Sequence, residues 1–308
     1  MSDNERWVRP LGTATTDSWE VAIDDDGVDG WQHTSLYAGR LAEGESREIP
    51  AGEWEHVVVP LSGSVTVESA EGKATLAGRD SVFAGPTDVA YVARDSSFTV
   101  TAAGGPARVA VCGARAGAPQ EPAFRHVAVE DVPVELRGAG TASREVRNFG
   151  TPGVLEADSI IACEVITPAG NWSSYPPHKH DEDREGVESE LEEIYYFEVQ
   201  VESAAGGSPA PAGADPVGYQ RVYGTDERPI DVLAEVRTGD VVLVPHGWHG
   251  PAMAAPGYDL YYLNVMAGPG RGSNGRAWLI CDDPAHGWVR ETWTSQDVDP
   301  RLPLGGTR

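Results

Sequence analysis

The sequence predicts an all-β protein of the sandwich or barrel type, built from two related halves. Its 36 glycines and 23 prolines interrupt short runs of Val, Ile, Thr and Tyr at close intervals, which is typical of strands joined by tight turns. No long stretch of the sequence has the 3.6-residue apolar period of an amphipathic helix. With 308 residues, 40% of them hydrophobic, the chain is long enough for two domains with packed cores.

The first half divides at its turn residues into a series of short strands. Residues 56–67, H-V-V-V-P-L-S-G-S-V-T-V, predict two strands about a Pro/Ser/Gly turn. The remaining strands predicted in this half cover residues 31–41, 78–83, 89–92, 98–101, 107–112 and 125–129. The Ala/Gly/Pro-rich residues 114–122 predict a linker, and residues 203–216 predict a surface loop on the same ground.

The second half repeats the first. L-A-G-R-D-S-V-F-A-G-P at 76–86 parallels V-R-T-G-D-V-V-L-V-P at 236–245, and H-V-V-V-P at His56 stands where E-I-Y-Y-F stands at Glu193. A repeat of more than about 100 residues indicates duplicated domains, because solenoid repeats are shorter. We therefore predict an N-terminal domain at residues 1–155 and a C-terminal domain at 156–308, which opens with the strand at 161–166.

The charge and the cysteines limit the function classes. A formal net charge of −25 argues against nucleic acid or anionic membrane as a partner, so an anionic substrate has to be met by local Arg or Lys. Cys112, Cys163 and Cys281 are far apart and predict free thiols in a reducing compartment. The absence of an apolar leader and of any apolar run of about eighteen residues favours a cytoplasmic location.

One stretch of the second half has the residue types of a metal centre. His178 and His180 in P-P-H-K-H-D are one residue apart, so both imidazoles project from one face of a strand. Glu193 opens the next strand, and G-D-V-V-L-V-P-H-G-W-H at 239–249 contains His246 and His249 after a Pro/Gly turn. Imidazoles with a carboxylate suit Zn, Mn, Fe or Ni better than Mg or Ca. Because the first half has no His-x-His pair, we expect it to bind no metal.

The order His-x-His, Glu, Gly-x5-Pro, Gly, His on strands resembles the two-motif signature of the cupin superfamily. Six ordered segments are more closely similar to the 5-deoxy-glucuronate isomerase family of inositol catabolism, a sibling of the 4-deoxy-5-keto-uronate isomerases of pectin breakdown. These segments are P-P-H-K-H-D, L-E-E-I-Y-Y-F, Q-R-V-Y, G-D-V-V-L-V-P-H-G-W-H, P-G-Y-D-L-Y-Y-L-N-V-M-A-G and D-P-A-H-G-W-V. The similarity is strongest over residues 176–288, and the acidic insert after His180 favours the inositol-pathway member.

The resemblance implies two cupin-type β-barrel, or jelly-roll, domains in one chain. It places the metal ligands at His178, His180, Glu193 and His249, with His246 and Glu192 as the alternatives to two of them. The implied metal is one divalent ion, with Zn or Mn ahead of Fe. Twelve residues separate His180 from Glu193 where the signature commonly has three or four, so we expect the residues between them to bulge out.

The resemblance also implies an intramolecular oxidoreduction of a sugar acid, the aldose–ketose conversion of 5-deoxy-glucuronate to 2-deoxy-5-keto-gluconate through an enediolate. Such a reaction needs a base, for which the sequence offers Glu192, Lys179, Tyr196, Tyr223 and Tyr261. The substrate carboxylate calls for a bidentate arginine, and Arg221 and Arg147 are the candidates, with Tyr196 as a further substrate contact.

Other functions stay open at this point. The ligand set also suits an Fe(II) cupin oxygenase, and a non-catalytic two-cupin protein that binds sugar acids is a further alternative. A homo-oligomer is compatible with the sequence. The sequence does not identify the metal, the base or the oligomeric state.

Overall fold

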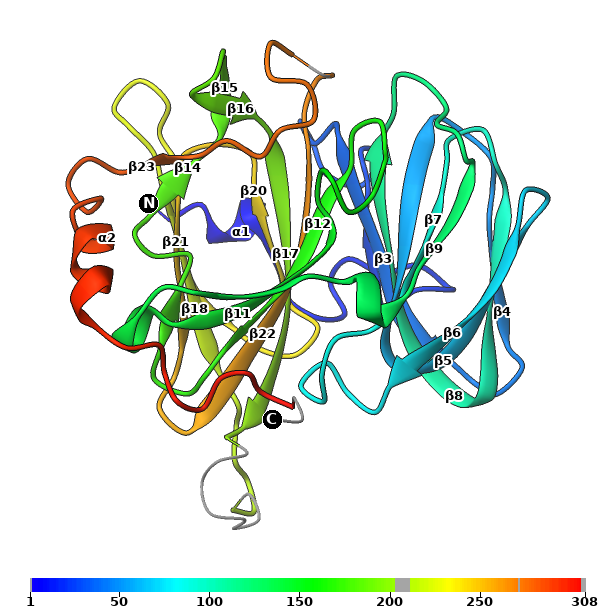
Figure 1. The fold of residues 1–308 in the computed structure, drawn as a ribbon, viewed down its shortest axis with the longest axis horizontal. Coiled ribbons are helices and arrows are strands. Elements are labelled where there is room, and N and C mark those ends of the chain that lie inside the picture. Colours follow the sequence, from blue (N-terminus) through cyan, green and yellow to red (C-terminus); the bar gives the residue numbers. More distant parts are fainter. Residues whose placement is uncertain (1, 203–210, 271, 306–308) are drawn as a thin grey trace.

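The computed structural model describes residues 2–202, 211–270 and 272–305, so most of the predicted loop at 203–216 lies outside the described residues. Nearly all regular structure in these ranges is strand, as predicted, and it forms two β-bodies that lie side by side (Figure 1). The α-helices of the described chain are the short α1 (Asn4–Trp7) and α2 (Val289–Thr292). No helix in this part of the chain has the length and apolar character needed to span a membrane.

The N-terminal body is a sheet of eight strands among the described residues. Its order is β2-β3-β8-β5-β7-β9, with β4 paired to β8 and β6 paired to β5. The strands are β2 (Val21–Ile23), β3 (Thr34–Leu41), β4 (Ser46–Ile49), β5 (Trp54–Ser69), β6 (Lys73–Arg79), β7 (Val89–Val92), β8 (Phe98–Arg115) and β9 (Phe124–Val127).

The predicted turn within residues 56–67 is instead a bend in the single long strand β5. Its pairing with β8 shifts register between Pro60 and Ser62 and again between Ser62 and Ser64, which is the mark of β-bulges. Gly63 has a φ of +74°, and a Cβ at this position would lie 2.6 Å from the carbonyl oxygen of Pro106. The Pro/Ser/Gly cluster therefore bends a strand without ending it, because glycine tolerates both the positive φ and the close backbone.

Among the described residues, the C-terminal body has two large sheets, which lie on opposite sides of it in Figure 1, and a separate two-stranded sheet within residues 181–190. The larger sheet has the order β1-β20-β17-β22-β12-β11-β10, and the smaller has β19-β18-β21-β14-β23 with β13 on β21. The larger sheet comprises β1 (Val8–Arg9), β10 (Val134–Arg137), β11 (Arg144–Gly150), β12 (Ile161–Thr167), β17 (Glu192–Val201), β20 (Val241–Val244) and β22 (Tyr258–Ala267). The smaller comprises β13 (Trp172–Ser173), β14 (His178–Lys179), β18 (Gly218–Tyr223), β19 (Asp231–Val236), β21 (Trp248–Ala254) and β23 (Cys281–Asp282).

The sheets do not divide the chain at the predicted boundary of 155 and 156. β11 pairs with β12, and β10 pairs with β11, so residues 134–150 belong to the C-terminal sheet. The first residues belong there too, because Val8 of β1 lies opposite Val242 of β20. The sequence orders residues only along the chain, whereas sheet membership depends on which edge strand offers free backbone groups. The chain therefore passes from the N-terminal body to the C-terminal body after β9.

A reciprocal pair of glutamates joins the two bodies. Glu55 on β5 accepts hydrogen bonds from the backbone N–H groups of residues 158, 159 and 160 at 2.9, 2.6 and 2.7 Å. Glu192 on β17 accepts the N–H groups of residues 32, 33 and 34 at 3.3, 2.7 and 2.7 Å. Each carboxylate thus binds backbone N–H groups at the start of a strand of the other body, β12 or β3. Glu55 and Glu192 directly precede the repeat positions His56 and Glu193, so the contact itself follows the internal repeat.

An apolar core continues across the same interface. One cluster of buried side chains contains Val57 and Tyr91 from the N-terminal body together with Ile161 and Val265 from the C-terminal body. A second cluster lies within the N-terminal body and includes Val58 and Val109. Burial of this shared apolar surface holds the bodies together, and the two glutamates set their register.

Glu55 and Glu192 together form a clamp between the two bodies, and replacing either of them should destabilise the protein. Glu192→Gln or Glu55→Gln turns an amide NH₂ towards backbone donors, so we expect the free energy of unfolding to fall by about 3 kcal/mol in each variant. Chemical denaturation measures this change. The control is Glu190→Gln, since Glu190 is exposed and its replacement should cost less than about 0.5 kcal/mol. Equal losses for Glu190→Gln and Glu192→Gln would rule out the clamp.

Candidate metal centre and substrate cavity

Three histidines and a glutamate meet inside the C-terminal body. His178 on β14 lies directly opposite His249 on β21, and His180 shares the face of His178 because it is two residues on. One ring nitrogen from each of the three histidines lies within 4.8 Å of those of the other two. Glu193 reaches them from the larger sheet, with Oε2 at 3.1 Å from Nε2 of both His180 and His249. All four side chains are buried.

Backbone carbonyl groups orient the three imidazoles. Nδ1 of His178 lies 3.4 Å from the oxygen of Pro176, Nδ1 of His180 lies 3.2 Å from that of Leu191, and Nδ1 of His249 lies 3.1 Å from that of Gly247. A carbonyl oxygen can only accept, so each Nδ1 carries the hydrogen. The Nε2 lone pairs are left to point at the centre of the cluster, which is how protein structures prepare histidines for metal coordination.

The electrostatics of the cluster favour a bound cation. Burial and the two neighbouring histidines hold the pKa of His178 well below its usual value. Burial also opposes protonation of His180, but the adjacent Glu193 carboxylate raises the pKa of this histidine overall. Burial opposes ionisation of Glu193, but the neighbouring His180 and His249 hold its pKa below its usual value, so the carboxylate is ionised at neutral pH. Converging lone pairs and a buried carboxylate fit a divalent ion of the kind that takes nitrogen and oxygen ligands.

The twelve residues between His180 and Glu193 bulge out as a hairpin, as expected. Its strands are β15 (Asp181–Arg184) and β16 (Glu188–Glu190), and its base closes where Leu191 donates its N–H to the oxygen of His180 at 2.8 Å. Asp181 accepts the N–H of Gly247 at 2.8 Å. This bond ties the hairpin to the turn that precedes His249, so the insert couples the two sequence segments of the cluster.

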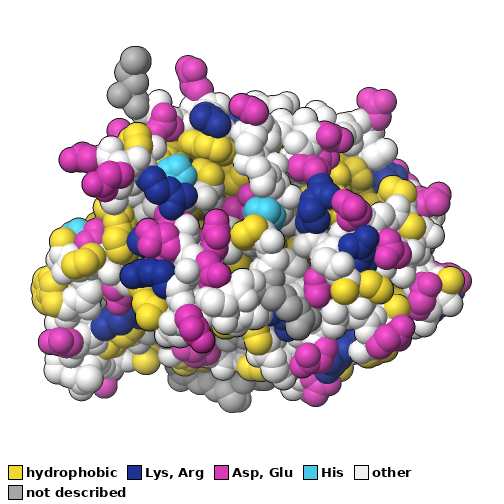
Figure 2. Space-filling view, turned by 90° about the horizontal axis from the view of Figure 1, so that it is seen from above, with side chains coloured by type: hydrophobic (Ala, Val, Ile, Leu, Met, Phe, Trp, Pro, Cys, Tyr) yellow, Lys and Arg dark blue, Asp and Glu magenta, His cyan; other side chains and the backbone are white. Residues whose placement is uncertain are grey.

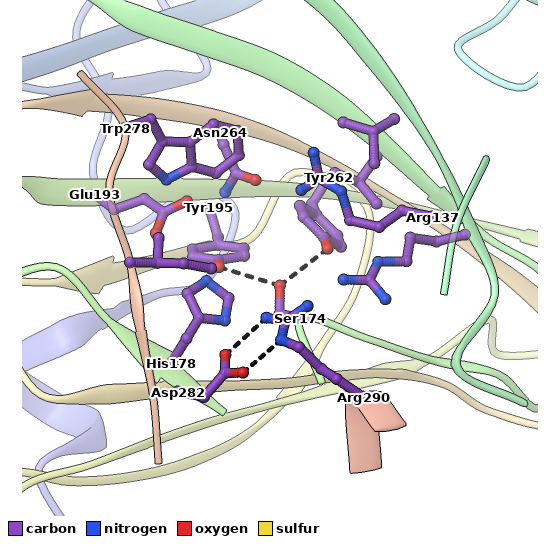
Figure 3. Close-up of a pocket in the computed structure, with 14 residues that line it drawn as sticks. Arg137, Ser174, His178, Glu193, Tyr195, Tyr262, Asn264, Trp278, Asp282 and Arg290 are labelled. Atoms are coloured by element: carbon purple, nitrogen blue, oxygen red, sulfur yellow. Dashed lines mark hydrogen bonds and ion pairs between the residues drawn. The ribbon is translucent and has the colours of Figure 1, made fainter. Parts of the chain in front are cut away.

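A cavity of about 330 Å³ opens beside the cluster. Figure 3 shows His178 and Glu193 on one side of it, Arg137 on the other, and Tyr195 and Tyr262 between them. Its lining residues are Arg137, Arg144, Val146, Val165, Ser174, His178, Glu193, Tyr195, Tyr262, Asn264, Trp278, Ile280, Asp282 and Arg290.

Polar groups dominate the middle of the cavity. The hydroxyl of Ser174 lies 3.3 Å from the phenol oxygen of Tyr195 and 3.0 Å from that of Tyr262. Burial raises the pKa of Tyr262 to about 12 and that of Tyr195 well above its usual value. Both phenols therefore keep their protons and act as hydrogen-bond donors at neutral pH. The indole Nε1 of Trp278 is a further donor, with no partner among the described side chains and backbone groups.

The predicted substrate contacts do not line this cavity. Arg147 is fully buried, donating to Glu145 at 2.7 Å and to the oxygen of Val82 at 2.8 Å across the interface between the bodies. Arg221 is on the outer face of β18, where it pairs with Asp231. The hydroxyl of Tyr196 accepts a bond from Arg108 at 2.9 Å and faces the other body.

The alternation of side chains along β11 explains why Arg144, and not the predicted Arg147, faces the cavity. In S-R-E-V-R-N, the side chains of Arg144 and Val146 line the cavity, whereas Glu145 and Arg147 bond groups on the opposite side of β11. Alternation along a strand predicts that residues 144 and 147 face different ways, but it does not tell which face is the inner one. The arginine in the cavity is thus Arg144, three positions before the predicted Arg147.

The predicted bases are also placed elsewhere. Glu192 is the interface clamp, and the Lys179 ammonium pairs with Asp181 and Glu188 at 2.6 and 2.8 Å, on the hairpin side of β14. Tyr223 donates to Asp283, and Tyr261 donates to Glu164 at 2.6 Å in the interface between the bodies. Burial raises the pKa of Tyr261 well above its usual value. His246 lies outside the group of converging histidines.

Sequence comparisons relate the chain to one protein family. The chain matches the KduI/IolB family over residues 7–289. It is 41% identical over 289 residues to the 5-deoxy-glucuronate isomerase of Geobacillus kaustophilus, covering 93% of this chain and 96% of the relative. It is 40% identical over 255 residues to that of Bacillus subtilis, covering 82% and 85% of the two chains.

Solved structures share the fold. The crystal structure of an IolB-like protein from Salmonella typhimurium superposes with a TM-score of 0.78 at 33% identity, covering 92% of this chain and 98% of that one. The oxalate decarboxylase of Lactobacillus farciminis superposes with a TM-score of 0.61 at 12% identity, covering 90% and 88%. The second likeness concerns the fold alone and supports the predicted cupin-type class.

Metal binding can be tested without a substrate. We expect about one divalent ion per chain after dialysis, and its removal by a chelator should lower the melting temperature, because a ligand bound only by the folded state stabilises it. His178→Ala and His249→Ala should lose the ion, as measured by elemental analysis. His246→Ala is the matched control and should keep it. Retention by His249→Ala with loss by His246→Ala would reverse the ligand assignment.

Proposed function

This chain belongs to the KduI/IolB family, and on that premise we propose that it is a metal-dependent isomerase of inositol catabolism. It interconverts 5-deoxy-glucuronate and 2-deoxy-5-keto-gluconate. The observation that supports metal dependence is the convergence of three Nε2 atoms and the Glu193 carboxylate at one side of a polar cavity. The assignment of 5-deoxy-glucuronate as the substrate is supported by the name of the relatives, which match this chain over 289 and 255 residues.

Aldose–ketose conversion requires removal of a proton from the carbon next to a carbonyl group and stabilisation of the enediolate that results. The residues that would hold the ion are His178, His180, Glu193 and His249. A divalent ion at such a site supplies a Lewis acid for the carbonyl oxygen. Zn and Mn, and after them Fe, suit this ligand set.

The protein must also move a proton between two neighbouring carbons. Among the described residues that line the cavity, the carboxylates are Glu193 and Asp282. Glu193 is directed at the histidines, whereas Asp282 lies opposite His178 in the pairing of β14 with β23. Arg290 orients Asp282 through a bond of 2.7 Å between Nη2 and Oδ1, as Figure 3 shows. We assign the proton transfer to Asp282.

The hydroxyl groups of the cavity complete the arrangement. Tyr195, Tyr262 and Ser174 contact one another in the stretch between the histidines and Arg137. Since their protons stay in place at neutral pH, they can donate hydrogen bonds to the sugar hydroxyls and to oxygen atoms on which charge develops. Such donors would position the open-chain sugar beside the Asp282 carboxylate.

The activity should be independent of oxygen. With metal-replete protein under anaerobic conditions, we expect 5-deoxy-glucuronate to be converted to the ketose, as followed by NMR, and His178→Ala to abolish the conversion. Conversion of 4-deoxy-5-keto-uronate in its place would move the assignment to the sibling reaction. An absolute need for oxygen would identify an oxygenase, and failure to convert either sugar acid would leave a binding protein.

Asp282→Asn should separate proton transfer from metal binding. We expect kcat to fall by about 100- to 10,000-fold, the usual contribution of a positioned base, while the ion content stays as in the wild type. Exchange of the substrate carbon-bound proton with D₂O should slow in parallel. The control is Asp283→Asn, whose side chain pairs with Tyr223 and does not line the cavity. If Asp282→Asn retains kcat, the assignment of the base is wrong.

A further inference from the structure

Three arginines line the cavity. Arg137 on β10 and Arg144 on β11 are opposite each other in the pairing of these strands, and Arg290 comes from α2. This concentration of positive charge is unusual for a chain with a formal net charge of −25. Acidic side chains are spread over both bodies on the face shown in Figure 2.

Two of the three arginines are already neutralised. Arg137 binds Glu135 through two bonds, of 3.0 Å from Nε and 2.7 Å from Nη2. Arg290 binds both oxygens of Asp282. These pairs cancel their own charges and leave little attraction for a further anion.

Arg144 is different, because no carboxylate pairs with it among the described residues. It is 5% exposed, its Nη1 donates to the oxygen of Ala142 at 3.0 Å, and its guanidinium lies 5.5 Å from the ring centre of Trp293. Burial, and the positive charge of its neighbours Arg137 and Arg290, lower the pKa of Arg144 to about 10. The nearby Glu135 carboxylate attracts Arg144 without forming an ion pair with it, and is itself bonded to Arg137. A buried guanidinium that lacks an ion pair is costly to the folded state, and an anion in the cavity would reduce that cost.

We propose that Arg144 binds the carboxylate of the substrate and thereby selects sugar acids over neutral sugars. The inference rests on the proposed function and adds to it the group that recognises the end of the sugar remote from its carbonyl. A hexuronate has its aldehyde and its carboxylate at opposite ends. The cavity has His178 and Glu193 on one side and Arg137 on the other, and Arg144 lies beside Arg137 in the strand pairing. The planar guanidinium can hold a carboxylate through two parallel bonds, which an ammonium group cannot do.

The first measurement is of binding, by calorimetry on metal-replete protein. Glucuronate is the charged probe, and glucuronamide is the uncharged probe of almost the same shape. We expect the wild type to bind glucuronate about 100-fold more tightly than the amide and Arg144→Gln to bind the two about equally. Arg144→Lys keeps the charge and should retain part of the preference. An equal loss for both probes would mean that Arg144 only supports the fold, and would overturn the proposal.

The second measurement is of turnover. Arg144→Lys should raise KM for 5-deoxy-glucuronate by about tenfold or more, with a smaller effect on kcat, because ground-state and transition-state binding are both lost. The control is Arg221→Lys, at the surface arginine that pairs with Asp231 outside the cavity, which should leave KM unchanged. Ion content and melting temperature verify that each variant is folded.

The two results together separate this inference from the proposed function. If the wild type isomerises 5-deoxy-glucuronate but Arg144→Gln keeps its preference for glucuronate over the amide, the role of Arg144 is refuted and the isomerase stands. If the wild type has no isomerase activity but its preference for glucuronate depends on Arg144, the anion site stands and the isomerase falls.

Discussion

The reciprocal glutamate clamp is the constraint on which the rest of the structure depends. Glu55 and Glu192 each accept three backbone N–H groups from the other body, and a buried carboxylate is stable only when such donors satisfy it. Because side chains alternate along a strand, a Glu192 that points at the neighbouring body obliges Glu193 to point into its own. One interface contact thus decides that Glu193 is the glutamate that reaches the histidines. The N-terminal body therefore has a structural role at the candidate site, since it holds the strand that carries Glu193.

Backbone groups orient the side chains of the candidate metal centre. Three carbonyl oxygens select the tautomer of three imidazoles, and the acidic hairpin joins the segment of His180 to the turn before His249 through Asp181. The long spacing between His180 and Glu193 is thus a structural device and not an interruption of the motif. Candidate ligands separated by up to 71 positions, from His178 to His249, are held in one place by strand pairing. Such a preformed donor set would reduce the ordering needed on binding.

Charge is distributed unevenly inside the C-terminal body. His178 and Glu193 lie on one side of the cavity, and Arg137 lies on the other. Phenol and hydroxyl groups that keep their protons lie between the two sides. A sugar acid matches such a gradient at both ends, with its carbonyl towards the histidines and its carboxylate towards Arg144.

Sequence alone determined the all-β class, the internal repeat and the group of histidines, because turn residues, periodicity and a His-x-His pair are local signals. It also identified the family. It did not determine which residues face the cavity: Arg147 was predicted where Arg144 lies, and Glu192 and Tyr261 were predicted as bases but bond groups across the interface between the bodies. Nor did it place residues 134–150 in the C-terminal sheet. Only the tertiary structure decided these points, because the face that a strand turns inward depends on the strands beside it, and those neighbours are distant in the chain.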